Sequence, residues 1–401
     1  MQKQLVTFNA GSSTVKIGTF ASDGQQIRKL ARGEIDLNAS PVTFRLRGES
    51  VNLDLALASA GAGNVVTILE ELFARLSDHI SPAHILGVGH RVVFGGDQFP
   101  GPILLDDEHI HAVESLSVFA PLHQPKSVAL IKAIRKLLPH LPQVASFDTA
   151  FHQTIPDTVR RFAIPRELHD HGIKRYGFHG LSYNSIIENF SRHEPELAGG
   201  KIVAAHLGSG ASLCAMDGGK SIDTSMSFST LDGIPMATRC GTLDPGVLLH
   251  LLQQENMQPG SLSDLLYHRS GLLGLSGISG DTRDLLANDD ARALEALDIF
   301  TARIAGEVCR LAATLGGLDA LIFTAGIGEH QPAIREAVCE RLSWLGLEMD
   351  ASANENNAFR ITNPACRVAA FVLATDEEQI IASQTLDALR NAALTAPVAS
   401  A

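Results

Sequence analysis

The sequence has few cysteines and no long apolar run, and each shortage excludes a class of protein. Its five cysteines are scattered, odd in number and form no C-x-x-C pair, which argues against a disulfide framework or a zinc site. No stretch of about 18 apolar residues could form a membrane-spanning helix, and the first residues lack the pattern of a secretory signal. We therefore expect a cytoplasmic protein with reduced thiols.

Positive charge is also scarce. The 32 Lys and Arg residues face 44 Asp and Glu residues, giving a formal net charge of −12 at pH 7, and no run of Lys or Arg forms a basic stripe. Nucleic acid and anionic membranes are therefore poor candidate partners. An anionic ligand would have to be held by a few local cations and by backbone N–H groups.

Strand and helix patterns occur in both halves of the 401 residues, which predicts an α/β protein of two domains. The opening "QLVTFNAGSSTVKIGTFAS" reads as two strands joined by a glycine-containing turn, and "KIVAAHLGSGASLCAMDGGKSID" repeats this pattern in the second half. Two such hairpins indicate a duplicated domain. Apolar residues at helical spacing predict helices over 65–79, 126–138, 291–315, 332–345 and 377–389.

A domain boundary is expected near Ala150, where a strand-like run ends and Pro156 interrupts its continuation. The last helix would return to the first domain after a second crossing near Asp376. We predict one domain over 1–149 together with about 378–401, and a second over 150–377. A cleft between two such domains is a common place for a ligand.

The two glycine turns are candidates for binding phosphate. In "NAGSSTVK", Asn9 ends a strand, Ser12 lies in the turn, and Thr14 and Lys16 share one face of the outgoing strand. Glycine lets the backbone approach a ligand closely, and successive N–H groups can bind an anion. The turn "HLGSGAS" from His206 has the same character. A polar hairpin turn with a solvated lysine is the alternative interpretation.

The better-known nucleotide motifs do not fit. "DGGKS" has the ending of a P-loop, but Cys214 stands where the loop needs glycine. "GIGEHQ" from Gly326 has Gln331 in place of the last glycine of a dinucleotide-binding loop, which disfavours a Rossmann dehydrogenase. "LIFTAGIGEH" nevertheless predicts a buried strand, a glycine turn and a helix, which suits contact with a flat ligand such as adenine; an ordinary strand-to-helix loop is the alternative.

A few charged residues stand in unusual settings. Arg91 interrupts an apolar run, and Arg239 lies in a loop rich in glycine and proline. A guanidinium matches carboxylate and phosphate oxygens with two donors, although a salt bridge is the alternative for each arginine. His123 and His179 are flanked by proline, glycine and aromatic residues. Asp148 ends an apolar run, as a carboxylate that orients a nucleophile does, or as a helix cap does.

Taken in order, these motifs resemble those of the acetate kinase family, which includes propionate and butyrate kinases and belongs to the actin-like ATPase superfamily. The resemblance runs almost end to end, through "NAGSSTVK", "GHRVV", "APLH", "FDTAFH", "RYGFHG", "HLGSGAS", "DTSM", "GLLGLSGISGDTRD", "FTAGIGE" and "TDEE". It implies two similar domains of the actin-like ATPase (ribonuclease H-like) type around a central cleft, and usually a homodimer.

The implied reaction is a reversible, Mg²⁺-dependent, direct in-line transfer of the γ-phosphoryl group of ATP to acetate, giving acetyl phosphate and ADP, with Mn²⁺ able to replace Mg²⁺. Catalysis of this kind depends on positioning and electrostatic stabilisation. Propionate kinase is the alternative within the family. An actin-like ATP-binding module that hydrolyses ATP without an acid acceptor is the alternative of another class.

The resemblance also assigns roles by position. The catalytic residues are Arg91, Asp148, His179 and Arg239, and the positions associated with the metal are Asn9 and Glu377. The acceptor acid would meet Arg91, Val93, Leu122, His123, Phe178 and Thr230. The nucleotide and its phosphates would meet Ser12, Thr14, Lys16, His206, Leu207, Gly208, Ser209, Gly210, Asp281, Thr282, Arg283, Gly326, Ile327, Gly328, Glu329 and His330.

Several positions depart from the family's common motifs without removing a predicted catalytic group. Tyr183 stands where the motif commonly has histidine, and Thr242 stands where it has aspartate. Val93 favours acetate, because enzymes that prefer propionate tend to have a smaller residue there. One methylene is worth only ~1–3 kcal/mol in such a pocket, so propionate should also react. The remaining departures are Phe94, Leu181, Thr230, Cys240 and His330.

Overall fold

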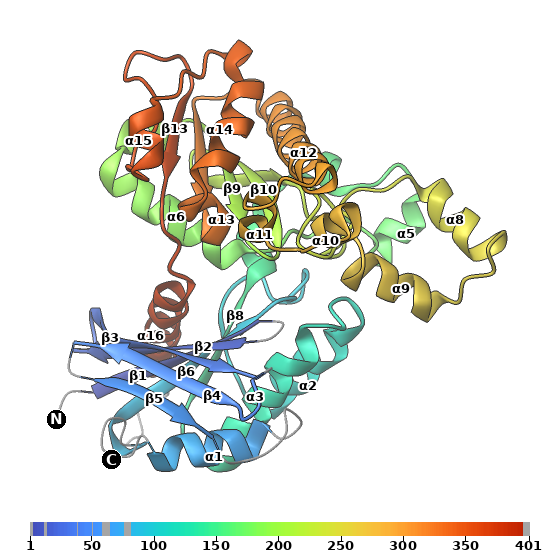
Figure 1. Ribbon diagram of the computed structural model, residues 1–401. Coiled ribbons are helices and arrows are strands. Elements are labelled where there is room, and N and C mark those ends of the chain that lie inside the picture. The colour runs from blue at the N-terminus through green and yellow to red at the C-terminus, as the bar shows by residue number, and fades with distance from the viewer. Residues whose placement is uncertain are drawn as a thin grey trace. The chain divides into compact units, whose positions relative to one another are not determined.

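The computed structural model describes residues 3–11, 14–37, 39–49, 51–57, 65–75 and 82–395. The chain divides into two compact units, each built on one β-sheet (Figure 1). The first unit comprises Met1–Phe151 and Asp376–Ala401, and the second comprises His152–Thr375. The α/β class is therefore confirmed. The predicted limits, 149–150 and 377–378, lie close to these boundaries.

The sheet of the first unit grows from the predicted N-terminal hairpin. β1 and β2 pair antiparallel, with Asn9 opposite Lys16, whereas β6 is parallel to β1 and β8 is parallel to β6. The strand order is β5-β4-β3-β2-β1-β6-β8-β7. The strands are β1 (Lys3–Ala10), β2 (Thr14–Ser22), β3 (Ile27–Asp36), β4 (Thr43–Gly48), β5 (Asn52–Ala56), β6 (Ile85–Val92), β7 (Ile103–Leu104) and β8 (Gln143–Phe147).

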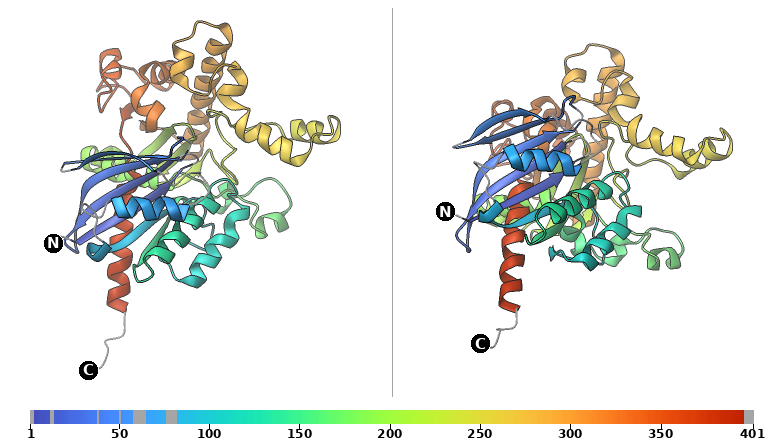
Figure 2. Two further views of the ribbon diagram at one scale, coloured as in Figure 1. Left: turned by 60° about the horizontal axis from the view of Figure 1, so that its bottom comes forward. Right: turned by 90° about the horizontal axis from the view of Figure 1, so that it is seen from below.

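Helices cover both faces of this sheet. On one face, α1 (Val65–Arg75) and α3 (Gln124–Leu137) pack on a buried cluster that includes Phe8, Ile17 and Val88. On the other face, α16 (Glu377–Thr395) buries Ala382 and Leu386 against Leu5 and Phe20 (Figure 2). The last helix therefore packs on the sheet of the first unit. The first predicted helix begins at residue 65, and its last residues, 76–79, lie outside the described residues.

The sheet of the second unit repeats the central part of the first. Its order, β11-β10-β9-β12-β13, matches β3-β2-β1-β6-β8. In both sets the first three strands are antiparallel and the next two run parallel to the hairpin's first strand. The duplication indicated by the two glycine turns is thus present in the topology. The strands are β9 (Lys201–Leu207), β10 (Ala211–Asp217), β11 (Lys220–Thr224), β12 (Ala320–Thr324) and β13 (Ala369–Val372).

Local signals set the bounds of the longest helix, α12 (Ala291–Leu315), which matches its prediction. The Asp290 carboxylate accepts a hydrogen bond from Arg292 N at the start, and Gly316 ends the helix in the left-handed conformation, with φ of 68°. The predicted helix 332–345 is shorter: α14 (Pro332–Arg341) is followed by the 3₁₀ turn η4 (Ser343–Leu345). None of the described helices is long and apolar enough to cross a membrane.

The remaining helices are short. α8 and α9 form an arm that extends from the second unit (Figure 1). Their bounds are α2 (Asp107–Ser115), α4 (Asp157–Arg160), α5 (Arg166–Asp170), α6 (Gly180–His193), α7 (Pro195–Ala198), α8 (Pro245–Gln253), α9 (Pro259–His268), α10 (Gly271–Ser276), α11 (Thr282–Leu286), α13 (Ala325–His330) and α15 (Ala351–Glu355), with 3₁₀ turns η1 (Pro82–His84), η2 (Leu116–Val118) and η3 (Asp148–Thr154).

Candidate active site

Three of the predicted site residues meet at one edge of the first sheet. Asn9 is near the end of β1, Arg91 is near the end of β6, and Asp148 directly follows β8. These strands are parallel neighbours, so their carboxyl ends lie at the same edge of the sheet. In open α/β sheets this edge is the usual place for a ligand.

The Arg91 guanidinium is held on both sides. Its Nε is 3.2 Å from each carboxylate oxygen of Asp148, and its Nη2 is 2.6 Å from Asp148 Oδ2. Its Nη1 donates to Asn9 Oδ1 at 3.1 Å and lies 3.9 Å from Glu377 Oε2. Burial opposes the charge, but the Asp148 and Glu377 carboxylates outweigh it and raise the pKa of Arg91 above its ordinary value. Arg91 therefore remains a cation.

The start of α16 supplies carboxylates to the same place. The Asn9 side-chain amide donates to Glu377 Oε2 at 2.8 Å and to Glu378 Oε1 at 2.9 Å, which leaves its oxygen to accept from Arg91. Glu378 is buried and also pairs with Arg32 at 3.4 Å. Sequence reasoning missed Glu378, although it is part of the "TDEE" motif. We call Asn9, Arg91, Asp148, Glu377 and Glu378 the carboxylate cluster.

The other predicted residues of the first unit surround the β1–β2 turn and the segment after β6. Gly11 N donates to Thr14 O at 2.8 Å, which closes the turn; Ser12 lies outside the described residues. Lys16 is exposed on the face of β2 that it shares with Thr14, as predicted. Val93 is buried, and Leu122 is 37 % exposed in the turn before α3. His123 precedes the first residue of α3.

Two buried residues fix the segment after β6, and sequence reasoning missed both. The Gln124 side chain bonds the backbone N–H and C=O of Phe94 at 3.1 and 2.9 Å, and Thr149 Oγ1 accepts from Gly95 N and Gly96 N. Their neighbours in sequence, His123 and Asp148, are among the predicted site residues. The only signal was therefore adjacency to a predicted residue.

In the second unit, two histidines stack at the start of α6. His179 precedes the helix in the left-handed conformation, with φ of 55°. Its ring lies 4.2 Å from that of His206, with 14° between the ring planes. His179 Nδ1 is 2.8 Å from Ser212 Oγ, and His206 Nδ1 is 2.8 Å from Ser182 Oγ. Each imidazole is thus oriented by a serine hydroxyl.

The turn after β9 lies beside both His179 and Arg239. A methyl group added at Gly210 would be 3.6 Å from His179 Nε2 and 3.7 Å from Arg239 Nη1. The Arg239 guanidinium is in turn held by Thr230 O, at 3.1 Å from Nη1. An imidazole, a guanidinium and a glycine backbone therefore share one small space, which suits an anionic oxygen.

His152 supports the loop that carries Phe178 and His179, and sequence reasoning did not assign it this role. Its Nε2 is 2.9 Å from Phe178 O and its Nδ1 is 2.8 Å from Ser221 Oγ. Because a carbonyl only accepts, Nε2 carries the hydrogen. Burial lowers the pKa of His152 to about 4, so the ring is neutral at pH 7. Gly177, with φ of 89°, passes so close that a Cβ would be 2.4 Å from this ring.

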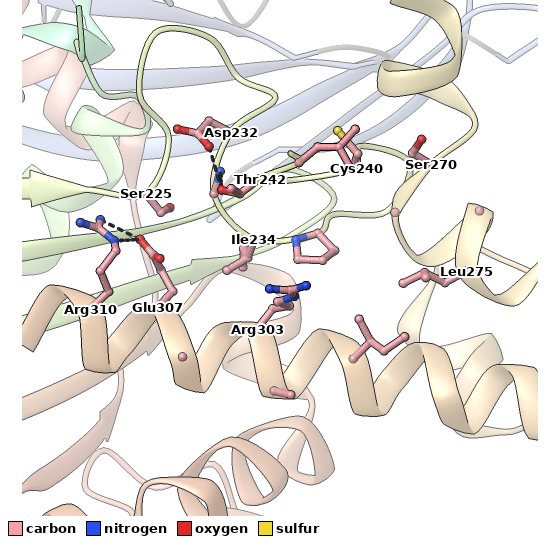
Figure 3. A pocket seen from close by; sticks show the side chains of 18 of the residues that line it. Ser225, Asp232, Ile234, Cys240, Thr242, Ser270, Leu275, Arg303, Glu307 and Arg310 are labelled. Carbon is pink, nitrogen blue, oxygen red and sulfur yellow. Dashed lines mark hydrogen bonds and ion pairs between the residues drawn. The ribbon is translucent and has the colours of Figure 1, made fainter. Parts of the chain in front are cut away.

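The segment 230–242, which we call the Arg239 loop, is held through Asp232. Thr242 Oγ1 donates to Asp232 Oδ1 at 2.8 Å (Figure 3), and Ser227 Oγ donates to the other oxygen. Thr242 thus keeps the loop closed where the family's motif has aspartate. Residues of the loop itself help to line a pocket of about 890 Å³, and none of the predicted site residues is among its lining. Its lining includes Cys240, Gly271, Leu275, Arg303 and Glu307.

The predicted adenosine segments are both held by local bonds. Asp281 caps α11 by accepting from Arg283 N at 2.9 Å, and hydrogen bonding from the Arg283 side chain lowers the pKa of Asp281. Thr282 is buried. The prediction of a glycine turn at Gly326 is wrong, because β12 passes directly into α13. The residue with the left-handed conformation at this junction is Ala325, with φ of 64°.

Two charged residues stabilise this junction. The Glu329 carboxylate accepts from Ala325 N at 2.9 Å and from Thr375 N at 3.3 Å. The fully buried Arg335, which sequence reasoning missed, donates to Gly328 O at 2.9 Å and Glu329 O at 3.1 Å. It also bonds Asn354. Because those carbonyls end α13, Arg335 fixes the orientation of the short helix.

The chain is similar to known proteins over nearly its whole length. The model of the acetokinase family matches residues 4–383. Acetate kinase of Rhodopseudomonas palustris is 52 % identical over 309 residues, covering 75 % of this chain and 77 % of its own, and acetate kinase of Methylocella silvestris is 40 % identical over 395 residues, covering 96 % and 98 %.

Solved structures agree with this result. The crystal structure of a propionate kinase from Francisella tularensis has a TM-score of 0.88 at 33 % identity, covering 95 % of this chain and 98 % of its own. That of Porphyromonas gingivalis acetate kinase has a TM-score of 0.84 at 36 % identity, covering 96 % and 100 %. The predicted actin-like ATPase type of fold is thereby confirmed, and the chain belongs to the acetokinase family.

Proposed function

We propose that this protein is an acetate kinase that transfers the γ-phosphoryl group of ATP to acetate. An acetate oxygen forms a bond to the γ-phosphorus, the bond from that phosphorus to the β–γ bridging oxygen breaks, and acetyl phosphate and ADP result. The observation that carries the proposal is the carboxylate cluster, in which Arg91 is fixed as a cation at the carboxyl ends of β1, β6 and β8. Membership of the acetokinase family supports the same reaction.

In the first unit, Arg91 is the proposed ligand of the acceptor carboxylate. Its guanidinium presents a planar set of donors that suits a carboxylate or phosphoryl oxygen. The Asp148 carboxylate holds that plane through Nε and Nη2, and Asn9 orients Nη1. Asp148 thus contributes by fixing the direction of the donors. Lys16 and Thr14, on one face of β2, are proposed to meet phosphate oxygens.

In the second unit, the proposed ligands of the phosphoryl oxygens are His179 Nε2, the Arg239 guanidinium and the turn from Gly208 to Gly210. Negative charge on these oxygens is stabilised by donors that are already in place before the reaction. The approach of Gly210 to both side chains supports this role, since any larger residue would occupy the space. The α11 and α13 segments remain the proposed adenosine site.

Asn9 and Glu377 are the proposed positions for Mg²⁺. Mg²⁺ takes oxygen ligands and is usually held by one or two carboxylates, with water and substrate phosphates completing its shell. The Glu377 carboxylate and the Asn9 side-chain oxygen, which here accepts from Arg91, are ligands of this kind. No group of three or more His, Cys, Asp or Glu in the described part of the chain is arranged to hold a metal. When bound with ATP, the ion would neutralise charge on the phosphates; Mn²⁺ should replace it.

Acetate is the proposed acceptor, with propionate as a slower one. The family resemblance assigns Val93, which is buried two residues after Arg91, to the acceptor pocket, where a smaller side chain would leave more room for a longer acid. Because one methylene is worth only ~1–3 kcal/mol of discrimination, the preference should be partial. The similarity to a propionate kinase structure makes propionate the competing assignment.

A cytoplasmic homodimer is the proposed form of the protein. Support for association comes from large apolar side chains exposed on the second unit, near and on the α8–α9 arm. Contiguous exposed apolar surface commonly marks a protein interface. Light scattering that gives the mass of one chain would argue against the dimer. The exposed side chains are Leu243, Val247, Leu249 and Leu275, at 39, 40, 54 and 40 %.

The function is tested by trapping acyl phosphate with hydroxylamine. Purified protein is given Mg-ATP with acetate, propionate, butyrate or no acid, and hydroxamate is measured. Most hydroxamate with acetate supports the proposal, and most with propionate would reassign the acceptor. No hydroxamate with any acid, together with steady ATP hydrolysis, would instead indicate an actin-like ATPase module.

The matched variants are Arg239→Ala and Arg269→Ala. Arg269 is an exposed arginine of the same unit that forms a surface pair with Asp264 at 2.7 Å. Arg239→Ala should lower turnover by ~10²–10³-fold, the usual cost of removing one charge-stabilising donor. Arg269→Ala should stay within twofold of the unchanged protein. Equal activity of the two variants would refute the role of Arg239.

A further inference from the structure

His179 ends a chain of three hydrogen-bonding groups that begins at a buried tyrosine. Tyr183 Oη is 2.6 Å from Ser212 Oγ, which is 2.8 Å from His179 Nδ1. Both Tyr183 and Ser212 are completely buried. Tyr183 is also one of the positions where this chain departs from the family's common motif, so the series of bonds depends on a residue that the common motif does not have there.

The direction of the hydrogen bonds from Tyr183 through Ser212 decides which ring nitrogen of His179 carries a hydrogen. A phosphoryl oxygen only accepts, so His179 must present a hydrogen on Nε2, the atom that faces Gly210. A neutral ring with a hydrogen on Nε2 has a bare Nδ1, which must accept from the Ser212 hydroxyl. That hydroxyl has a single hydrogen, so its oxygen is then left to accept from Tyr183.

The reverse order would disable the site. If Ser212 donated to Tyr183, His179 would have to donate from Nδ1, and a neutral ring would turn a bare Nε2 toward the anion. Among the described residues, His206 is stacked on the ring at 4.2 Å, and the Arg239 guanidinium lies across Gly210 from it. Because Arg239 already supplies positive charge, a neutral donor at His179 is sufficient.

We infer that Tyr183 is a positioning residue which, through Ser212, keeps His179 in the tautomer with its hydrogen on Nε2. The inference rests on the proposed function for its catalytic consequence, but the tautomer itself is a property of the ground state. Tyr183 is completely buried and is bonded to Ser212, so its proposed action on His179 is indirect. Its contribution is to settle the direction of two hydroxyl groups before the phosphoryl group arrives.

Kinetics test the catalytic consequence. Tyr183→Phe removes one oxygen and keeps the ring, so kcat should fall about tenfold, in the range that loss of an orienting partner usually costs, while KM for ATP and for acetate stays within twofold. Ser212→Ala should have the same effect, and the double variant should be no slower than Ser212→Ala. Additive losses would overturn the inference, because they would mean independent roles.

The matched control is Tyr176→Phe. Tyr176 is a buried tyrosine of the same unit whose hydroxyl donates to Gly172 O at 2.8 Å, away from His179. This substitution should leave kcat within twofold of the unchanged protein. A tenfold loss in both variants would show that a missing buried hydroxyl is enough, and would remove the case for Tyr183.

Histidine-ring NMR tests the tautomer without any need for turnover. With ¹⁵N-labelled histidine, the His179 signals are assigned by their loss in His179→Gln. The unchanged protein should show a protonated Nε2 and a bare Nδ1, and Tyr183→Phe should show a mixture. The same single tautomer in both would refute the inference, even if the protein formed acyl phosphate; a protein that formed none while showing the expected shift would fail only the proposed function.

Discussion

At the scale of single residues, Arg91 shows why geometry matters in addition to charge. Its guanidinium meets Asp148 through two nitrogens and Asn9 through a third. A lysine would keep the charge but could not make this planar set of contacts. We expect Arg91→Lys to lower kcat/KM for acetate by ~10²-fold or more, the cost of losing an oriented donor, while KM for ATP changes little. The hydroxamate assay measures both.

The control for this prediction is Arg28→Lys. Arg28 is an exposed arginine of the first unit that forms a surface pair with Glu49 at 3.4 Å. Exposed pairs contribute little to stability, so kcat/KM and stability should be nearly unchanged. If Arg91→Lys kept more than half of the activity, a fixed guanidinium would not be needed, and the proposed carboxylate ligand would have to be sought elsewhere.

Sequence reasoning identified most residues of the carboxylate cluster but not all of them. Asn9, Arg91, Asp148 and Glu377 stand out because each is a polar residue beside an apolar run or within a motif. Glu378, and Ser212 beside His179 in the second unit, also lie within motifs but received no role, since an acidic residue in a helix or a serine in a strand is ordinary until its distance to a partner is known. Roles that depend on three-dimensional distance are therefore the ones that a single sequence leaves open.

At the scale of elements, Gly271 controls how α10 meets the Arg239 loop. Its φ is 60°, and an added Cβ would lie 2.1 Å from Met236 O and 2.7 Å from Arg239 O. No flexible side chain could yield, because both atoms belong to the backbone. We expect Gly271→Ala to displace the Arg239 loop and to lower the free energy of unfolding by at least ~1 kcal/mol. The unfolding midpoint and kcat should both fall as a result. Thermal unfolding and the hydroxamate assay measure the two effects.

Gly260→Ala provides the comparison. Gly260 lies in the first turn of α9, and a Cβ there would meet nothing within 4 Å. Alanine should therefore be neutral or slightly stabilising at this position. Equal stability and activity of Gly260→Ala and Gly271→Ala would mean that the Arg239 loop tolerates the clash, contrary to the expectation.

A second element, α13, depends on Arg335. This buried arginine donates to carbonyls of Gly328 and Glu329 and to Asn354, so Arg335→Leu would leave several buried acceptors without a partner. Each such acceptor costs about 1–3 kcal/mol, so a loss of at least ~3 kcal/mol is expected. KM for ATP should rise, because α13 belongs to the proposed adenosine site. Urea unfolding and ATP titration measure these changes.

Arg341→Leu, on the same helix α14, is the matched control. Arg341 pairs with the exposed Asp298, and its side chain is 31 % exposed. Its loss should cost less than ~1 kcal/mol and leave KM for ATP unchanged. A similar loss of stability in the two variants would show that helix α14, and not the bonds to α13, accounts for the effect.

The junction before α13 also shows where local rules fail. The motif "TAGIGE" contains two glycines, so a turn at one of them is the natural prediction. The left-handed conformation falls instead on Ala325, whose N–H is bonded by the Glu329 carboxylate four residues later. The same carboxylate also accepts from Thr375 N, so contacts of the Glu329 side chain have overridden the preference for glycine at positive φ.

At the scale of the whole molecule, the repeated hairpin was enough to predict the duplicated sheets. Two strands around a glycine turn recur in each half, and parallel strands follow both. The additional strands β4, β5 and β7 of the first sheet, and the arm formed by α8 and α9, have no counterpart in the repeat and were not predicted. The position of such additional elements depends on pairing and packing with segments that are distant in the sequence. A periodic pattern of apolar residues does not predict these long-range contacts.

Both units contain a neutral buried histidine, so the stability of each unit should depend on pH. Burial lowers the pKa of His90 in the first unit and of His152 in the second from 6.5 to about 4. Between these values the unfolded chain binds protons that the folded chain does not. The contribution of each histidine to the free energy of unfolding should therefore be greatest above about pH 6.5. It should fall as the pH drops toward 4, by up to ~3 kcal/mol for each histidine.

Urea unfolding at pH 7.5, 5.5 and 4.5 measures this dependence. His152→Asn is the informative variant, because an amide can still donate to Phe178 O but does not titrate. It should be less stable than the unchanged protein at pH 7.5 and should lose less further stability on going to pH 4.5. Carboxylates also titrate in acid, but they do so in both proteins and cancel in the comparison. Parallel pH profiles for the two proteins would show that His152 does not couple folding to protonation.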